Sequence, residues 1–194
     1  MLTFYFVRHG QTQSNIEHTL QGWCDTPLTP LGIKQAITAR ERYKDIEFLA
    51  VYSSPSKRAY ETAHKLCPTH QVILLDGLKE MNFGRKEGCP EDFEGCHTSM
   101  ERIEYDWHRY GGETIEDLCK RMSQTLHTLV ETYSDKTGNI LCVSHGFAIL
   151  AVLRAIDISA YHKYIKEGNF VQNCAALILC YEEGQFICKE YNIV

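Results

Sequence analysis

Two short apolar runs of the chain each break directly into a histidine–glycine pair. Residues 2–7 lead into Arg8-His9-Gly10, and residues 140–143 lead into Ser144-His145-Gly146. Short apolar runs bounded by polar residues are typical of buried strands, and ligands of open parallel sheets bind beyond the carboxyl ends of such strands. We therefore expect the two histidines to meet in one pocket, where a pair of imidazoles fits either a metal ion or a phosphate group.

Positively charged groups close to these histidines favour phosphate chemistry. Arg8 carries a permanently charged fork that matches phosphate oxygens, and Gly10 lets the backbone approach a ligand closely. Arg58 follows a Ser-Pro pair on the first turn of a predicted helix, near the positive end of the helix dipole. The simpler alternatives are a solvated arginine on a helix face and histidines that are only hydrogen-bonded at strand ends.

A carboxylate is also needed, because an acid that protonates the leaving oxygen accelerates phosphoryl transfer. Glu80 is the best placed, since it lies just past a short predicted strand and before a glycine-bearing loop. Most other acidic residues lie on predicted helix faces or in turns. Asp76 and Glu87 are nearby competitors, and an exposed loop carboxylate is the alternative interpretation of Glu80.

The elements that position these residues alternate between strand and helix patterns. Besides the two runs above, apolar segments predict strands at 48–52 and 72–75 and a C-terminal hairpin of 175–181 and 185–191. Helical spacing predicts helices at 32–43, around 58–62, at 114–133 and at 147–156. This alternation predicts an α/β fold, a three-layer α/β/α sandwich around a mostly parallel central sheet.

No repeat, low-complexity tract or change of composition divides the chain, so we expect residues 1–194 to form a single domain. The stretch 77–95 is irregular, and 91–112 adds aromatic residues among charges. Helical pieces formed there could cover an opening, so we identify 88–112 as a candidate lid. Its aromatic side chains, like Trp23 in an earlier loop, either line the site or fill the core.

The composition argues against several classes of protein. A formal charge of −5 over 194 residues, with Lys and Arg spread along the chain, argues against nucleic acid as a partner. No stretch is apolar for long enough to cross a bilayer, and Met1 leads straight into a strand-like segment, so we expect a cytoplasmic protein. Nine cysteines without any Cys-x-x-Cys pair favour free thiols over disulfides or a metal site.

Several short motifs occur together along residues 3–146. They are Arg8-His9-Gly10, Gln21-Gly22-Trp23, Asp25-x-Pro27-Leu28-Thr29-x-x-Gly32, Ser54-Pro55 with Arg58-Ala59 and Thr62-Ala63, Glu80 with Phe83-Gly84, Gly111-Gly112-Glu113-Thr114, and Ser144-His145-Gly146. In this order, the combination resembles the histidine phosphatase superfamily, the phosphoglycerate-mutase-like family. The resemblance implies a phosphoglycerate-mutase-like fold and a reaction that needs neither a metal ion nor another cofactor.

The resemblance also implies a role for each site residue. His9 would attack phosphorus to form a phosphohistidine, while His145, Arg8 and Arg58 hold the equatorial oxygens. Glu80 would protonate the leaving oxygen and then deprotonate the water that hydrolyses the intermediate. The same resemblance assigns a second set to phosphate or substrate binding: Gly10, Asn15, Gln21, Gly22 and Gly146.

The expected activity is hydrolysis of a phosphate monoester, with a small phosphorylated metabolite as substrate. Mutases of this family carry Arg-His-Tyr after the acid and Glu-Ser after Arg-His-Gly, whereas Met81-Asn82-Phe83 and Gln11-Thr12 stand at these places here. The chain is also short for a mutase, whose extra segments keep water away from the reactive intermediate.

Two other activities stay open, a phosphoglycerate-type mutase and a module that binds phosphorylated ligands without turnover. The intact set of site residues counts against the binding module. The substrate is not determined by the sequence, since the pocket walls could accept a sugar, a nucleotide, a cobalamin precursor or a phosphoprotein. The oligomeric state is likewise open.

Overall fold

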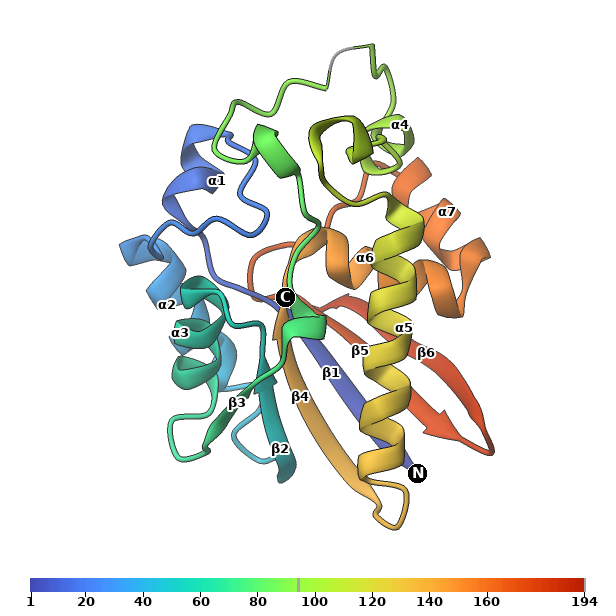
Figure 1. The fold of residues 1–194 in the computed structure, drawn as a ribbon. Helices are drawn as coiled ribbons and strands as arrows, with labels where there is room; N and C mark the ends of the chain where they lie inside the picture. Colours follow the sequence, from blue (N-terminus) through green and yellow to red (C-terminus); the bar gives the residue numbers. More distant parts are fainter. Residues whose placement is uncertain (94, 194) are drawn as a thin grey trace.

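The computed structural model describes residues 1–93 and 95–193, which form one six-stranded sheet between helices (Figure 1). The strands are β1 (Leu2–Arg8), β2 (Phe48–Ser53), β3 (Val72–Leu74), β4 (Gly138–Ser144), β5 (Ala176–Glu182) and β6 (Gln185–Ile193). Their order across the sheet is β3-β2-β4-β1-β5-β6. The first four strands run parallel, and β5 and β6 form an antiparallel hairpin at one edge.

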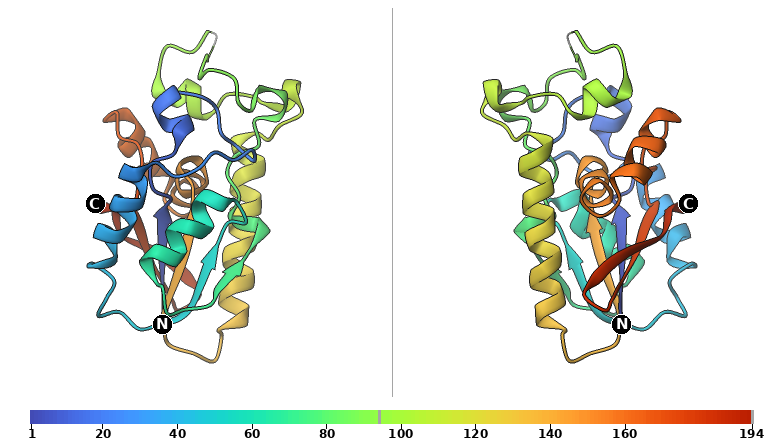
Figure 2. Two further views of the ribbon diagram at one scale, coloured as in Figure 1. Left: turned by 90° about the vertical axis from the view of Figure 1, so that its left-hand side faces the viewer. Right: turned by 90° about the vertical axis from the view of Figure 1, so that its right-hand side faces the viewer.

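Two groups of helices cover the two faces of the sheet. One face carries α2 (Pro30–Arg40) and α3 (Lys57–Leu66). The other carries α5 (Ile115–Thr132) and α6 (Gly146–Ile156), with α7 (Ile158–Lys166) packed against α6. Figure 2 shows α2 and α5 on opposite sides of the strands. The predicted three-layer α/β/α sandwich with a mostly parallel sheet is therefore confirmed.

Side chains of the central strands alternate between two separate cores. Phe4 and Phe6 of β1 pack under α5 and α6, while Val7 packs under α2 and α3. Burying a phenylalanine side chain contributes about 1.5–3 kcal/mol. Because a slip of one residue would exchange the two faces, this burial fixes the register of β1 against its neighbours, and with it the position of the strand end.

Threonine side chains set the beginnings of the early helices. Thr12 accepts a hydrogen bond from the Asn15 N–H and starts α1 (Gln13–Glu17), a helix that is not among the predicted elements. Thr29 caps α2, which begins two residues before the predicted start. The apolar residues of α2 divide, since Ile37 is 52% exposed whereas the small Ala36 is fully buried and lets the helix approach the sheet.

The helix α7 is not among the predicted elements. Asp157 accepts a hydrogen bond from the Ala160 N–H at its start, and Tyr161, Tyr164 and Ile165 form its buried face.

Within the described residues, no helix is long and apolar enough to cross a membrane. All nine cysteines are free thiols, as predicted.

The segment 88–112 lies beyond the carboxyl ends of the parallel strands (Figure 1), except that Glu94 is outside the described residues. It contains α4 (Ser99–Ile103) and a short 3₁₀ turn at His108–Tyr110. Trp107 is 1% exposed and contacts the ring of Phe83 at 4.9 Å between centroids. Trp107 belongs to the same core as Phe4 and Phe6 of β1, so the segment is packed onto the body of the protein, and its role as a lid stays a prediction.

Two glycine-bearing segments lock this region together. Gly84 has φ +58°, and a Cβ atom there would lie 2.1 Å from the carbonyl oxygen of Tyr110. The Glu113 N–H donates to the Asn82 carbonyl at 2.8 Å, and the Glu113 carboxylate accepts the Asn82 N–H at 3.0 Å. The Phe83-Gly84 and Gly111-Gly112-Glu113 motifs therefore act as one contact, which only glycine allows at position 84.

Candidate active site

The ends of β1 and β4 bring the two predicted histidines together. These strands are parallel neighbours in which Arg8 pairs with Ser144, and the His9 N–H donates to the Ser144 carbonyl at 3.0 Å. The ring centroids of His9 and His145 are 5.2 Å apart, and the residues are 3% and 0% exposed. The sheet register itself therefore sets the spacing of the pair.

His9 is held as a neutral ring with one defined tautomer. Its Nδ1 lies 2.7 Å from the carbonyl oxygen of Gly10, which can only accept, so Nδ1 carries the proton. The lone pair is then on Nε2. Burial, followed by the positive charges of Arg58 and Arg8, holds the pKa of His9 well below its ordinary value of 6.5. At neutral pH the ring is therefore an uncharged imidazole with an available lone pair.

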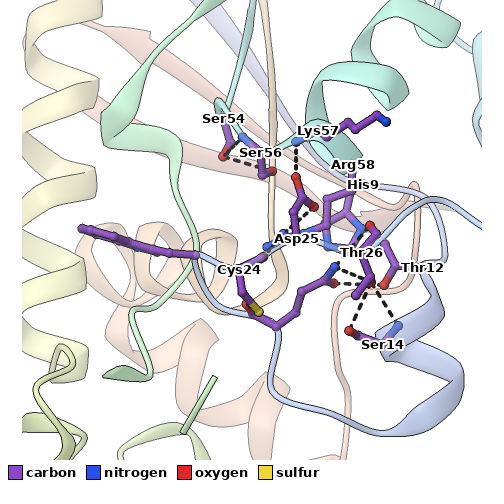
Figure 3. Close-up of polar contacts among 12 residues, drawn as sticks. His9, Thr12, Ser14, Cys24, Asp25, Thr26, Ser54, Ser56, Lys57 and Arg58 are labelled. Atoms are coloured by element: carbon purple, nitrogen blue, oxygen red, sulfur yellow. Dashed lines mark hydrogen bonds and ion pairs between the residues drawn. The ribbon is translucent and has the colours of Figure 1, made fainter. Parts of the chain in front are cut away.

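The guanidinium of Arg58 is fixed by the loop that precedes α2. Its Nη1 donates to the Cys24 carbonyl at 2.8 Å and to the Asp25 carboxylate at 3.0 Å, and its Nη2 donates to the Gly22 carbonyl at 2.7 Å. Figure 3 shows Asp25 between Arg58 and the backbone N–H of Lys57, at the start of α3. Arg58 is only 1% exposed, so its orientation is not free to change.

Two arginine Nε–H groups are left over for a ligand. Arg8 uses its Nη1 on the Val171 carbonyl at 2.6 Å. The Nε atoms of Arg8 and Arg58 are both buried and have no hydrogen-bond partner among the described residues. Because an unpaired buried donor is costly, two such charged donors beside a neutral histidine indicate a site for an anion.

Glu80 lies against the start of α6. Its Oε1 accepts the N–H groups of Met81 and Ala148, both at 2.9 Å, and its Oε2 accepts the Phe147 N–H at 3.2 Å. A carboxylate is favoured at a helix N-terminus. Burial nevertheless raises the pKa of Glu80 above its ordinary value, although these N–H groups oppose the shift. The group can thus hold a proton at a pH where most carboxylates have lost theirs.

A network behind Glu80 fixes the segment that carries it. Arg121 of α5 donates to the carbonyls of Gly77, Lys79 and Glu80 at 2.9, 2.8 and 3.0 Å. The same guanidinium makes a two-pronged contact with the Glu113 carboxylate at 2.9 and 2.8 Å. The backbone on the inner side of the site is therefore anchored to the longest helix.

His145 stands immediately before α6 and is also neutral. Burial, then Arg58 and His9, holds its pKa well below the ordinary value. Its Nε2 lies 3.4 Å from the Ser56 hydroxyl, while its Nδ1 is buried and has no partner among the described residues. One ring nitrogen is therefore available to a ligand.

These groups face a cavity of about 490 Å³. Arg8, His9, Arg58 and Glu80 line it, and so do four of the residues predicted to bind substrate, Asn15, Gln21, Gly22 and Gly146. Aromatic rings form another part of its wall: Phe83, Phe93, Phe147 and Phe170. His145 lines a neighbouring cavity of about 300 Å³ that shares Glu80 and Gly22 with the first.

Gly10 has a different place from the one predicted. It is not among the described residues that line either cavity, and its N–H donates to the Thr62 hydroxyl at 3.0 Å. A Cβ atom on Gly10 would lie 2.4 Å from the carbonyl oxygen of Gly32. Its geometry is that of a close packing contact rather than of a direct contact to ligand.

The competing carboxylates are engaged elsewhere. Asp76 is exposed and pairs with Lys79 at 3.1 Å, and Glu87 binds backbone N–H groups of the loop at Trp23 and Cys24. Among residues 1–93 and 95–193, no three His, Cys, Asp or Glu side chains are grouped so that they could hold a metal ion.

Sequence reasoning missed the segment before β5. Asn173 donates from Nδ2 to the His9 carbonyl at 3.0 Å and to the Asn15 side chain at 3.4 Å. Phe170 and Val171 complete the cavity wall. No local pattern marks these residues, because their partners lie more than 150 positions earlier in the chain.

Comparison with known proteins places this arrangement in a family. A model of the histidine phosphatase superfamily (branch 1) matches residues 4–194. The chain belongs to this superfamily. A histidine phosphatase relative in Bacillus subtilis (strain 168), described as an uncharacterized phosphatase, PhoE, is 32% identical over 197 residues, which cover 100% of this chain and 95% of that protein.

Two solved structures show how widely the superfamily fold is shared. Phosphoglycerate mutase from Bacillus anthracis str. Sterne superposes with a TM-score of 0.86 at 26% identity, over 98% of this chain and 92% of that one. Phosphoserine phosphatase from Entamoeba histolytica, in complex with 3-phosphoglyceric acid, superposes with a TM-score of 0.82 at 28% identity, over 100% and 98%. Phosphatases and a mutase are thus both similar to this histidine phosphatase superfamily member.

Proposed function

We propose that the protein is a phosphatase that hydrolyses a phosphate monoester through a phosphohistidine on His9. The observation that carries this proposal is the neutral His9 ring, whose Nδ1–H donates to the Gly10 carbonyl, beside the unpartnered Nε–H groups of Arg8 and Arg58. A nucleophile with an available lone pair and two fixed positive donors are the parts that phosphoryl transfer requires.

In the first half of the reaction, His9 Nε2 attacks phosphorus while the bond from phosphorus to the alcohol oxygen breaks. Arg8, Arg58 and His145 bind the equatorial oxygens in orientations that need no rearrangement. Glu80 gives its proton to the departing oxygen. Because Glu80 Oε1 already accepts two N–H groups at 2.9 Å, we assign that proton to Oε2, which is less strongly bound.

In the second half, water attacks the phosphohistidine and Glu80, now a carboxylate, takes the proton of that water. The bond from phosphorus to His9 breaks, and inorganic phosphate leaves. His18, Glu91 and Arg102 line the cavity and are exposed, so water has a path to the intermediate. Access for water favours hydrolysis over return of the phosphoryl group to a second hydroxyl.

The alcohol part of the substrate belongs in the remainder of the cavity. A volume of about 490 Å³ is within the range of small-molecule sites and leaves room beyond the phosphate. A small phosphorylated metabolite is the substrate class we propose, as the phosphoserine phosphatase with bound 3-phosphoglyceric acid also suggests. The segment 88–112, which contributes Phe93 and Arg102 to the wall, would cover this end of the substrate.

The test is release of inorganic phosphate from p-nitrophenyl phosphate by the purified protein in the presence of EDTA, since the mechanism uses no metal ion. We expect the wild type and a His127→Ala control, which alters an exposed histidine on α5, to be active. His9→Ala should be inactive and should form no acid-labile phosphoprotein. Full activity in His9→Ala would refute the assignment of the nucleophile.

A mutase is the second candidate, because the phosphoglycerate mutase of Bacillus anthracis shares the fold. Incubation with 3-phosphoglycerate and catalytic 2,3-bisphosphoglycerate distinguishes the two reactions. We expect slow release of phosphate and no rapid isomerisation; rapid isomerisation without release would make the protein a mutase. Tight binding of phosphopeptides with no turnover of any ester would instead favour the binding module.

A further inference from the structure

Glu87 grips the loop that holds Arg58. Its Oε1 accepts the Trp23 N–H at 2.8 Å, and its Oε2 accepts the Cys24 N–H at 2.6 Å. Glu87 is half-buried and is not among the described residues that line the cavity. Its Oε1 also accepts the Phe83 N–H at 3.4 Å, so the carboxylate binds backbone N–H groups rather than a ligand.

The loop that binds Glu87 through its N–H groups also binds Arg58 through its carbonyl groups. The Trp23 N–H and the Gly22 carbonyl belong to one planar trans peptide unit, so they point in opposite directions. One edge of this unit donates to Glu87, and the other accepts from Arg58 Nη2 at 2.7 Å. A negative charge at the N–H polarises the unit and strengthens the carbonyl as an acceptor.

A second connection runs through Cys24. Its N–H donates to Glu87, and its carbonyl accepts from Arg58 Nη1 at 2.8 Å. Each oxygen of the carboxylate thus takes one N–H of the loop, and each Nη of the guanidinium takes one carbonyl. Figure 3 shows Cys24 and Asp25, neighbours in this loop, next to Arg58. The arrangement leaves Arg58 Nε as the atom without a partner.

The local backbone is built for this contact. Gly22 has φ +47°, and a Cβ atom there would lie 2.4 Å from Glu87 Oε1, so only glycine permits the approach. On the other side of Glu87, the Gly88 N–H donates to the Leu20 carbonyl at 2.7 Å, and the Leu20 N–H donates to the Cys89 carbonyl at 2.9 Å. The two segments are therefore paired at the point where the carboxylate bridges them.

From this geometry we infer that Glu87 is a positioning residue for Arg58, and that it aims Arg58 Nε at the phosphoryl group. The inference rests on the proposed function, in which Arg58 binds that group. A glutamine at position 87 would keep one acceptor but turn an amide N–H₂ toward the second loop N–H, which breaks one of the two contacts. The loop would then hold the guanidinium less firmly.

The experiment is a double-mutant cycle on binding of inorganic phosphate, measured by calorimetry. The proteins are wild type, Glu87→Gln, Arg58→Lys and the double variant. Lysine keeps the charge but lacks the fork that the two carbonyls hold. We expect Glu87→Gln to weaken phosphate binding about tenfold in the wild-type background, equal to about 1.4 kcal/mol, and to have no further effect in the Arg58→Lys background. The value of kcat/KM should follow the same pattern.

Two controls separate positioning from general stability. Glu61→Gln removes a carboxylate from the helix of Arg58 that pairs with Lys57 at 3.9 Å, and it should leave phosphate binding unchanged. Glu87→Asp keeps the charge but withdraws it by one methylene, so we expect it to weaken phosphate binding as Glu87→Gln does. It replaces Glu87→Gln in the cycle if the glutamine variant folds poorly. Thermal unfolding of every variant reports the structural cost, which should be equal in both backgrounds.

Equal loss of phosphate affinity in the two backgrounds, or no loss in Glu87→Gln, would overturn the role of Glu87. This result is distinct from failure of the proposed function. If the proposed function fails, the wild type turns over no ester or His9→Ala stays active, and the binding cycle can still be measured.

Discussion

The free energy of unfolding is expected to fall between pH 7.5 and pH 5.5, because two histidines of the site are buried without charge. Burial, followed by Arg58, holds the pKa of both His9 and His145 well below 6.5 in the folded protein. In the unfolded chain each ring takes up a proton near pH 6.5. The stability from these rings is therefore complete above pH 6.5 and is lost as the pH falls, since only the unfolded state then binds the protons.

The unfolded-state pKa sets the largest value that this effect can reach. One unit below its pKa, a ring that is protonated only in the unfolded state costs about 1.4 kcal/mol, so the two rings together cost about 2.8 kcal/mol at pH 5.5. This is a large share of the roughly 5–15 kcal/mol that stabilises a typical domain. Glu80 acts in the opposite direction, because burial raises its pKa and so favours the folded state as the pH falls.

Urea unfolding of the wild type, of His9→Asn, of His145→Asn and of the double variant measures these contributions. The buffers must be free of phosphate, which binds the folded state. Comparing the two pH values within each variant cancels the cost of the substitution itself. We expect each single variant to lose about 1.4 kcal/mol less than the wild type, and the double variant about 2.8 kcal/mol less. If the double variant lost as much as the wild type, the inference of neutral rings in the folded protein would be wrong.

Three further predictions concern the acid, the pH profile of the reaction and one glycine. Glu80→Gln should lower kcat for an alkyl phosphate by about 10²–10⁴-fold, and less for p-nitrophenyl phosphate, whose leaving group needs little help from a proton; steady-state phosphate release measures both. The value of kcat/KM should fall on the alkaline side as Glu80 loses its proton, because burial raises the pKa of this carboxyl group. It should fall on the acid side only below pH 6.5, where His9 becomes protonated, because burial lowers the pKa of that ring. A Glu80→Gln variant that kept the alkaline limb would contradict this assignment. Gly84→Ala should lower the free energy of unfolding, measured by urea titration, by more than Gly168→Ala does. Both glycines have positive φ, but only a Cβ at position 84 would meet another atom, the Tyr110 carbonyl oxygen. Equal losses in the two variants would show that this contact carries no cost.

The central strands could be predicted from the sequence because both of their faces are buried. Residues 140–143 are fully buried, so β4 appears in the chain as an unbroken apolar run between polar residues. The helix α1 could not be predicted in this way. Its Ile16 is 52% exposed, and the helix depends on the capping contacts of Thr12 rather than on an apolar face. The helix α7 did carry a signal, an Asp157 cap before buried aromatic residues at helical spacing.

Some residues of the site could likewise be predicted from local sequence patterns, whereas others depend on contacts between distant positions. His9 and His145 could be placed together because each follows a strand that the pattern reveals. The residues that hold the loops of the site could not be predicted, because Glu87 binds Trp23 across 64 positions and Arg121 binds Glu80 across 41. The choice among Glu80, Asp76 and Glu87 depended on position along the chain, whereas what separates them in the structure is burial and the partner that each carboxylate holds.

The strand order explains why phosphate chemistry would occur at this edge of the sheet. From β1 the chain moves outward through β2 and β3 with α2 and α3 on one face, and it returns through α5 on the other face to insert β4 beside β1. The loops that follow β1 and β4 therefore leave toward opposite faces and open a crevice between two adjacent strand ends. The spacing of His9 and His145 depends on the buried sheet, while Arg58 and Glu80 depend on loops braced by Glu87 and Arg121. On the proposed function, changes in the outer wall of the cavity would therefore alter the alcohol that is accepted without moving the groups that we propose for phosphoryl transfer.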